Sequence, residues 1–231
     1  PSVILPSAGN IVTPWSQQVS LGIERQLARD WVLSADYILN RGTNLIRSRD
    51  INVRQVGDNE FELPGLDERF VQVNQIETSG SSTYHGFTAK LRKRFAQDFS
   101  LMASYTYGKA IDDTTDFITQ LQANNQRDLR SEKSLSSFDQ RQRFVISGVY
   151  QSPWTVSGSD GFVHNLFADW TFAPIITISS GRPFNLLLGY DLNGDTHEET
   201  DRPVLLVVNN PIVGRNTGRG PGLSSVDIRL G

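Results

Sequence analysis

The chain of 231 residues contains no cysteine, which excludes disulfide bonds and thiolate metal sites. No apolar run approaches the roughly 20 residues that a membrane-spanning helix needs. Lysine and arginine number 22 against 25 acidic residues, and this balance gives no electrostatic reason to expect nucleic acid as a partner. The three histidines are isolated from one another, and neither H-E-x-x-H nor G-x-S-x-G occurs, so we expect no enzyme, no catalytic residues and no organic cofactor.

What the chain does contain is alternation of apolar and polar residues, clearest in the stretch "LRKRFAQDFSLMASYTYGKAID" at 91–112. Alternation with a period of two predicts β-strands with one apolar face and one polar face. The apolar set of this stretch is Leu91, Phe95, Phe99, Leu101, Ala103, Tyr105 and Tyr107.

An internal repeat extends this pattern, because residues 21–40 align without gaps on residues 89–108. Each copy predicts a hairpin with a short Ala-x-Asp connection, at Ala28–Asp30 and at Ala96–Asp98. In the first hairpin the predicted pairing sets Leu27 against Trp31, Ile23 against Ala35 and Val19 against Leu39.

Three further alternating segments bring the count to seven predicted strands, with connections that differ between the two ends. One end has the two short turns and a medium segment, Gln151–Ala168. The other end has three long segments, Arg41–Ser82, Lys109–Phe138 and Gly181–Leu223. Short turns at one end and long loops at the other are typical of outer-membrane β-barrels.

The lengths of the predicted strands and the positions of the aromatic residues also favour a membrane-spanning barrel. Trp15–Leu27 and Tyr84–Phe95 are longer than the typical soluble strand of about 5–6 residues. Aromatic residues gather near both strand ends, as in the two interfacial girdles of a barrel. The sequence therefore predicts an all-β, antiparallel up-and-down segment of a transmembrane barrel, with outer-membrane lipid as a partner. The alternative is a soluble, secreted, glycan-binding sandwich, in which the face of Phe87, Leu91, Leu101 and Tyr105 would be a dry core.

Motifs spread along the chain resemble the barrel of TonB-dependent outer-membrane transporters, in particular the Oar-like group. They include "QQVSLGIERQL" with "SADYILNRGTNL", "YHGFTAKLRKRF" with "ASYTYGKAID", "SSFDQRQRFVISGVYQ", "SSGRPF", "DRP" and "GRNTGRGPGLSSVDIRL". The resemblance implies a bacterial outer-membrane barrel of about twenty-two strands around a plug domain, with TonB-driven uptake of a small ligand that the sequence does not identify. Residues 1–231 would then be a partial barrel without the signal peptide, the plug and the remaining strands. A passive porin or structural barrel is the rival within the same membrane.

Two groups of residues are candidate sites. The run "DLNGDTHEETDRP" offers hard oxygen ligands for Ca²⁺ from Asp191, Asn193, Asp195 and Asp201. Its match to the EF-hand pattern is incomplete, which favours the other interpretation, a solvated acidic loop with an Asn-Gly turn. The second group comprises basic residues expected to face the lumen: Lys90, Arg92, Arg94, Arg141 and Arg143.

These basic residues allow two interpretations. They could attract an anionic substrate by their summed charge. They could instead pair with acidic residues of the plug or of neighbouring strands, and Glu24, Asp36 and Asp139 on the same face favour this second interpretation.

Overall fold

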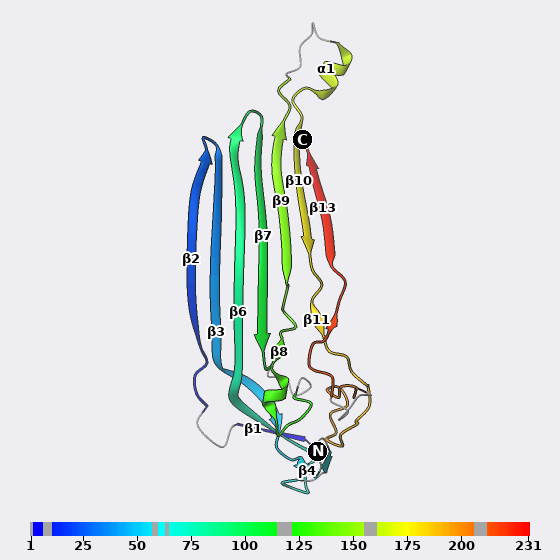
Figure 1. The fold of residues 1–231 in the computed structure, drawn as a ribbon. Helices are drawn as coiled ribbons and strands as arrows, with labels where there is room; N and C mark the ends of the chain where they lie inside the picture. Colours follow the sequence, from blue (N-terminus) through cyan, green and yellow to red (C-terminus); the bar gives the residue numbers. More distant parts are fainter. Residues whose placement is uncertain are drawn as a thin grey trace.

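The computed structural model describes residues 2–6, 11–56, 60–62, 65–114, 122–154, 161–205 and 212–231. Seven long strands dominate it: β2 (Trp15–Ala28), β3 (Trp31–Asp50), β6 (Gln72–Ala96), β7 (Phe99–Asp112), β9 (Gln142–Gln151), β10 (Thr171–Ser179) and β13 (Leu223–Leu230). They form one antiparallel sheet in the order β13-β10-β9-β7-β6-β3-β2. Figure 1 shows these strands side by side in chain order, which confirms the predicted all-β, up-and-down arrangement.

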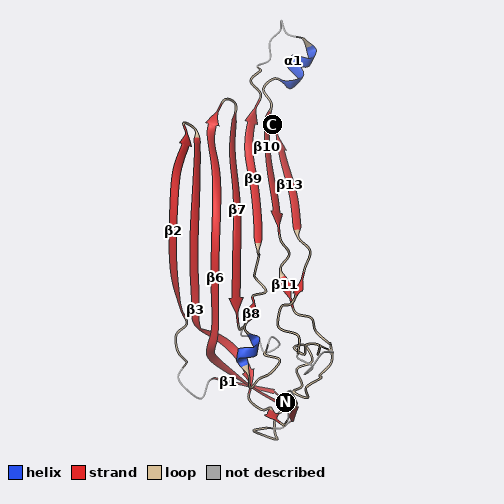
Figure 2. Cartoon of the chain, viewed as in Figure 1, coloured by secondary structure: helices blue, strands red, loops and turns tan. Residues whose placement is uncertain are grey.

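The smaller elements lie at the two ends of the sheet (Figure 2). The sequence analysis did not predict them. They are β1 (Ser2–Pro6), which pairs in parallel with β6, and β8 (Ser134–Leu135), which pairs with β7; β4 (Arg54–Gln55) with β5 (Phe61–Glu62); β11 (Pro183–Phe184) with β12 (Gly218–Arg219); the 3-10 helix η1 (Leu129–Glu132); and α1 (Phe162–Phe167). Within the described residues, no helix is long and apolar enough to cross a membrane.

The repeated segments are two hairpins of the same design, β2–β3 and β6–β7. The predicted partners Ile23 with Ala35 and Val19 with Leu39 are confirmed. The predicted pairing of Leu27 with Trp31 is wrong, because Ala28 pairs with Trp31 across a register shift next to the turn. The second hairpin has a register shift at the same place, between Lys93 and Ala96. Such bulges add a residue to one strand and re-aim the chain into its turn.

In the part of the chain that the structure describes, no second layer covers the apolar side of the sheet. A soluble sandwich would bury it under a second sheet, yet Phe87 is 45% and Tyr105 is 37% exposed. Among the described residues, the buried apolar side chains are few: Val32, Val53, Val73, Ala123 and Ala168. The sandwich alternative is therefore wrong, since an exposed apolar face this large requires an apolar environment outside the protein.

Strands β3 and β6 continue well into the segment that the sequence analysis took as a loop, Arg41–Ser82. They stay paired as far as Asp50 with Asn74. The pairing shifts register on both sides of Leu45, and the loop ends of both strands bend away from the rest of the sheet (Figure 1). Bulges disrupt the ladder and bend a strand, so the extended ends turn towards the long connections.

Candidate functional site

The long connections meet at one end of the sheet in a body of polar side chains. We call it the loop body: the described residues within 47–77, 112–139 and 185–216. Arg47 Nη2 donates to the Asp113 carboxylate at 2.7 Å and so joins the first segment to the second. Asn193 Nδ2 donates to the Asn124 carbonyl oxygen at 2.8 Å and joins the third to the second. Three segments that are far apart in sequence therefore form one unit (Figure 1).

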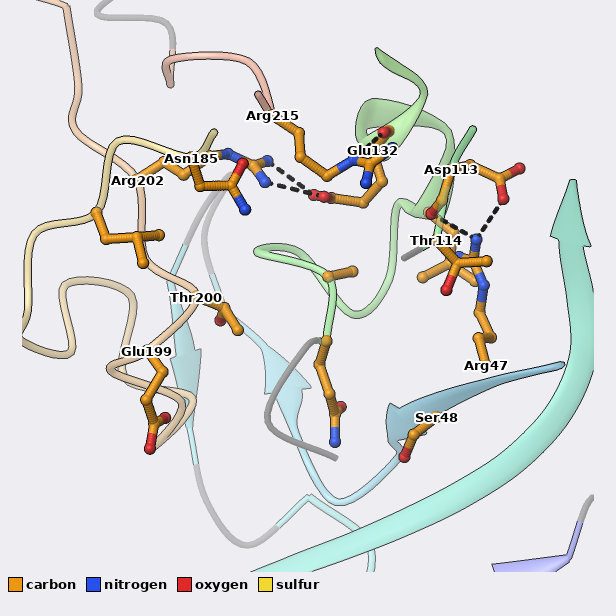
Figure 3. Close-up of a pocket in the computed structure, with 14 residues that line it drawn as sticks. Arg47, Ser48, Asp113, Thr114, Glu132, Asn185, Glu199, Thr200, Arg202 and Arg215 are labelled. Atoms are coloured by element: carbon orange, nitrogen blue, oxygen red, sulfur yellow. Dashed lines mark hydrogen bonds and ion pairs between the residues drawn. The ribbon is translucent and has the colours of Figure 1, made fainter. Parts of the chain in front are cut away.

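A buried ion pair lies at the centre of the loop body. Arg202 Nη1 and Nη2 donate to Glu132 Oε2 and Oε1 at 2.9 and 2.7 Å, a two-bond fork between guanidinium and carboxylate. Arg215 Nε donates to the Glu132 carbonyl oxygen at 2.9 Å and its Nη2 donates to Asp112. Figure 3 shows both arginines directed at Glu132. These charged groups are buried and hydrogen-bonded to one another. Removing one partner would therefore leave a buried charge unpaired, which is strongly destabilising.

A cavity of about 80 Å³ lies beside this ion pair (Figure 3). Two buried atoms of its lining residues, Arg47 Nε and Ser48 Oγ, have no hydrogen-bond partner among the described residues. The volume suits a few water molecules, whereas pockets for organic ligands are usually about 300 Å³ or larger. The cavity is therefore part of the interior of the loop body and not a site for a nutrient-sized molecule.

The structure brings together three of the four sequence-predicted metal ligands. Oxygen atoms of Asp191, Asp195 and Asp201 lie within 4.8 Å of one another. Asn193 is used differently: its Oδ1 accepts the backbone N–H of Asp195 at 3.0 Å, while its Nδ2 donates to Asn124. The arrangement is a carboxylate cluster held by an asparagine turn, and hard cations such as Ca²⁺ prefer carboxylate oxygens.

The carboxylate cluster has His197 as a nearby basic group. Burial is the main cause that raises the pKa of Asp195 to about 6, against the hydrogen bond from the His197 backbone N–H and the charge of His197, which both lower this pKa. Burial also raises the pKa of Asp201, although that carboxylate accepts the Leu192 backbone N–H at 2.7 Å. Among the described residues, no lysine or arginine forms an ion pair with any of the three acids.

The sequence analysis missed the contact that links this cluster to β3. His197 Nε2 lies 3.1 Å from Asp50 Oδ2, and both side chains are buried. Burial works against protonation of His197, but the hydrogen bond with Asp50 and the charges of Asp195, Asp50 and Glu199 raise its pKa. The two residues are separated by 147 positions, so no local pattern could have indicated the pair.

The sequence-predicted basic residues do not form one cluster. Lys90 pairs with Asp36 at 3.2 Å on the polar face. Arg92 and Arg94 line one hollow together with Arg229, and no hydrogen bond or ion pair holds the side chains of Arg92 and Arg94 among the described residues. Arg143 is paired in the ladder with Thr106. Arg141 stands just before β9, where it pairs with Asp139 at 3.3 Å and stacks over the Tyr107 ring at 5.8 Å.

Comparisons with known proteins agree with this geometry. The chain is similar to the crystal structure of the outer membrane transporter YddB from Escherichia coli, with a TM-score of 0.55 and 11% sequence identity. The match covers 96% of this chain and 26% of that chain, so this chain spans about a quarter of the length of the transporter. No curated protein sequence matches the chain.

A family model also matches nearly the whole sequence. It is described as an outer membrane beta barrel domain and covers residues 4–225. The open antiparallel sheet, its exposed apolar face and its polar opposite face are what such a domain requires. The chain therefore belongs to the outer membrane beta barrel domain family, and its location is the bacterial outer membrane.

Proposed function

We propose that this chain forms part of the wall and the external loops of a TonB-dependent, Oar-like outer-membrane transporter that takes up a small ligand actively. The observation that carries the proposal is the loop body, in which three connections are fixed together by buried ion pairs such as Arg202–Glu132. A structured body at the end of a barrel offers a surface that can recognise a ligand before it enters. The similarity to an outer membrane transporter supports the same conclusion.

The remaining parts of the transporter are also proposals. The polar face lines the lumen, and the full-length protein adds further strands and a plug domain. Arg92 and Arg94 would meet acidic groups of that plug, because neither guanidinium has a partner among the described residues. The barrel would bind and pass its ligand without altering it, so we propose no catalytic role for any residue.

Uptake by cells that produce the full-length protein tests this proposal. Labelled siderophores, oligosaccharides, peptides and cobalamin would be offered, and internal label would be measured with and without TonB. We expect one class of ligand to accumulate above its external concentration, and this accumulation to disappear in cells without TonB. A passive porin would instead let the ligand equilibrate equally in both strains, and that result would contradict the proposal.

We further propose that Asp191, Asp195 and Asp201 hold a Ca²⁺ ion that stabilises the loop body. The raised pKa of Asp195 means that ionising this carboxyl costs folding free energy, so stability falls as the pH rises from 3.8 to about 6. A bound dication offsets this cost, because it adds positive charge to three acids that no lysine or arginine pairs with among the described residues.

Calcium should raise the midpoint of thermal unfolding of the full-length protein in detergent. At about 100 times the dissociation constant, a ligand specific to the folded state contributes about 2.7 kcal/mol. Asp195→Asn should abolish most of this shift, whereas Glu198→Gln, an exposed neighbour outside the cluster, should keep it. An equal shift in the wild type and the Asp195→Asn variant would rule out this site.

A further inference from the structure

The apolar face carries a short row of basic groups near the loop end of the sheet. Val19, Leu39, His85 and Lys109 are successive partners across β2, β3, β6 and β7, and they project from the apolar face. One step farther towards the loops, Arg41 occupies the same face, paired with Thr83. We call Arg41, His85 and Lys109 the basic rim.

The depth of the basic rim follows from the aromatic residues beside it. Tyr37, Phe87 and Tyr107 are successive partners one step closer to the middle of the strands. Aromatic side chains of barrels mark the boundary between hydrocarbon and lipid headgroups. The rim therefore lies just beyond this boundary, at the level of the headgroups, and long basic side chains reach there readily.

The basic rim is open on its outer side. All three side chains are exposed, and the side chains of Arg41 and Lys109 have no hydrogen bond or ion pair among the described residues. Lys93, a cation on the same face at the turn end, behaves differently: it is buried and its Nζ donates to the Phe99 carbonyl oxygen at 3.0 Å. Lys93 thus has its partners within the protein, whereas the side chains of Arg41 and Lys109 have none among the described residues.

His85 is held in place within the rim. Its Nδ1 lies 2.8 Å from the Tyr37 hydroxyl, which leaves Nε2 as the ring nitrogen for an external contact. His85 and Lys109 are direct cross-strand partners, so their Cβ atoms are about 5 Å apart. Arg41 on β3 is the diagonal neighbour of His85, which therefore lies between the two long basic side chains.

We propose that the basic rim binds the phosphate of an anionic lipid in the outer leaflet. A guanidinium offers two parallel hydrogen bonds to phosphate oxygens, and a lysine adds a mobile point charge. The position at headgroup depth selects a phosphate attached to lipid, not one free in solution. This inference rests on the barrel and on the long loops facing outwards, as in other outer-membrane barrels; it does not depend on transport or on TonB.

The test uses the full-length protein in neutral detergent, with thermal unfolding followed by circular dichroism. Bisphosphorylated lipid A, its dephosphorylated form and inorganic phosphate would be titrated separately. We expect lipid A alone to raise the unfolding midpoint. The lipid A concentration that gives half of this effect should increase about fivefold in Arg41→Gln and about 20-fold or more in Arg41→Gln/Lys109→Gln. Each basic residue near an anionic surface contributes about 1 kcal/mol, which corresponds to about a fivefold change in affinity.

Arg25→Gln is the matched control, since Arg25 is exposed and lies on the same face near the turn end. This variant should respond to lipid A like the wild type. Unfolding midpoints without lipid give each variant its own reference, so a general loss of stability does not imitate loss of binding. An equal response in the double variant and the wild type would overturn the proposal, as would an equal effect of inorganic phosphate.

Discussion

Glu132→Ala is expected to open the loop body of the full-length protein while leaving the strands folded. The change leaves the Arg202 guanidinium buried without its carboxylate, and breaking a buried pair in this way costs about 3–5 kcal/mol. Asn124 also loses the acceptor for its backbone N–H, which Glu132 Oε1 provides at 3.2 Å. Hydrogen exchange should therefore accelerate about 100- to 4,000-fold at loop-body amides, and much less in β7 and β9.

Two further variants make this expectation specific. Glu132→Leu combined with Arg202→Met removes both charges, so much of the protection should return. Arg54→Gln breaks the Arg54–Glu62 pair, which is exposed on both sides, and should change exchange by less than about fivefold because exposed pairs contribute at most about 1 kcal/mol. If Glu132→Ala exchanged no faster than Arg54→Gln, the ion pair would not hold the loop body together.

Ala103→Arg should destabilise the barrel by about 2–4 kcal/mol, because it places a cation among lipid chains. Ala103 lies on the apolar face between Leu91 and Ile146, roughly midway between the Tyr37–Phe87–Tyr107 row and the aromatic pair Phe99–Tyr150. Unfolding by denaturant in lipid vesicles would measure the loss for the full-length protein.

Thr88→Arg is the counterpart on the other face. Thr88 pairs with Asp36 and Thr106 on the polar face, between the same aromatic rows. An arginine there meets water and a carboxylate, so the expected change is below about 1 kcal/mol. If the two variants were equally stable, or if Thr88→Arg were the less stable, the assignment of the apolar face to lipid would fail.

The strands of the barrel wall could be predicted because they depend on patterns between residues that are close in the sequence. Alternation places Ile23 and Ala35 on one face, and a turn of two residues then fixes their pairing. The one error, at Leu27, came from a bulge, which alternation does not reveal because the extra residue keeps an apolar side chain.

The loop body was not predictable in the same way. The acidic run suggested that Asp191, Asp195 and Asp201 belong together, because their short spacing is visible in the sequence. The contacts that hold the run in place join residues at separations of 70 and 147, as in Arg202–Glu132 and His197–Asp50. Such polar pairs follow no periodicity, and Asp50 lies at the end of β3, beyond the segment where alternation marks the strand.

The length of β6 has a consequence for what can reach this protein from outside the cell. Its 25 residues span up to about 80 Å at 3.3 Å per residue, whereas the hydrocarbon layer is about 30 Å thick. Much of this strand, and the loop body at its end, therefore projects beyond the lipid. Antibodies, bacteriophages and proteases too large to enter any barrel could contact this projecting part on intact cells.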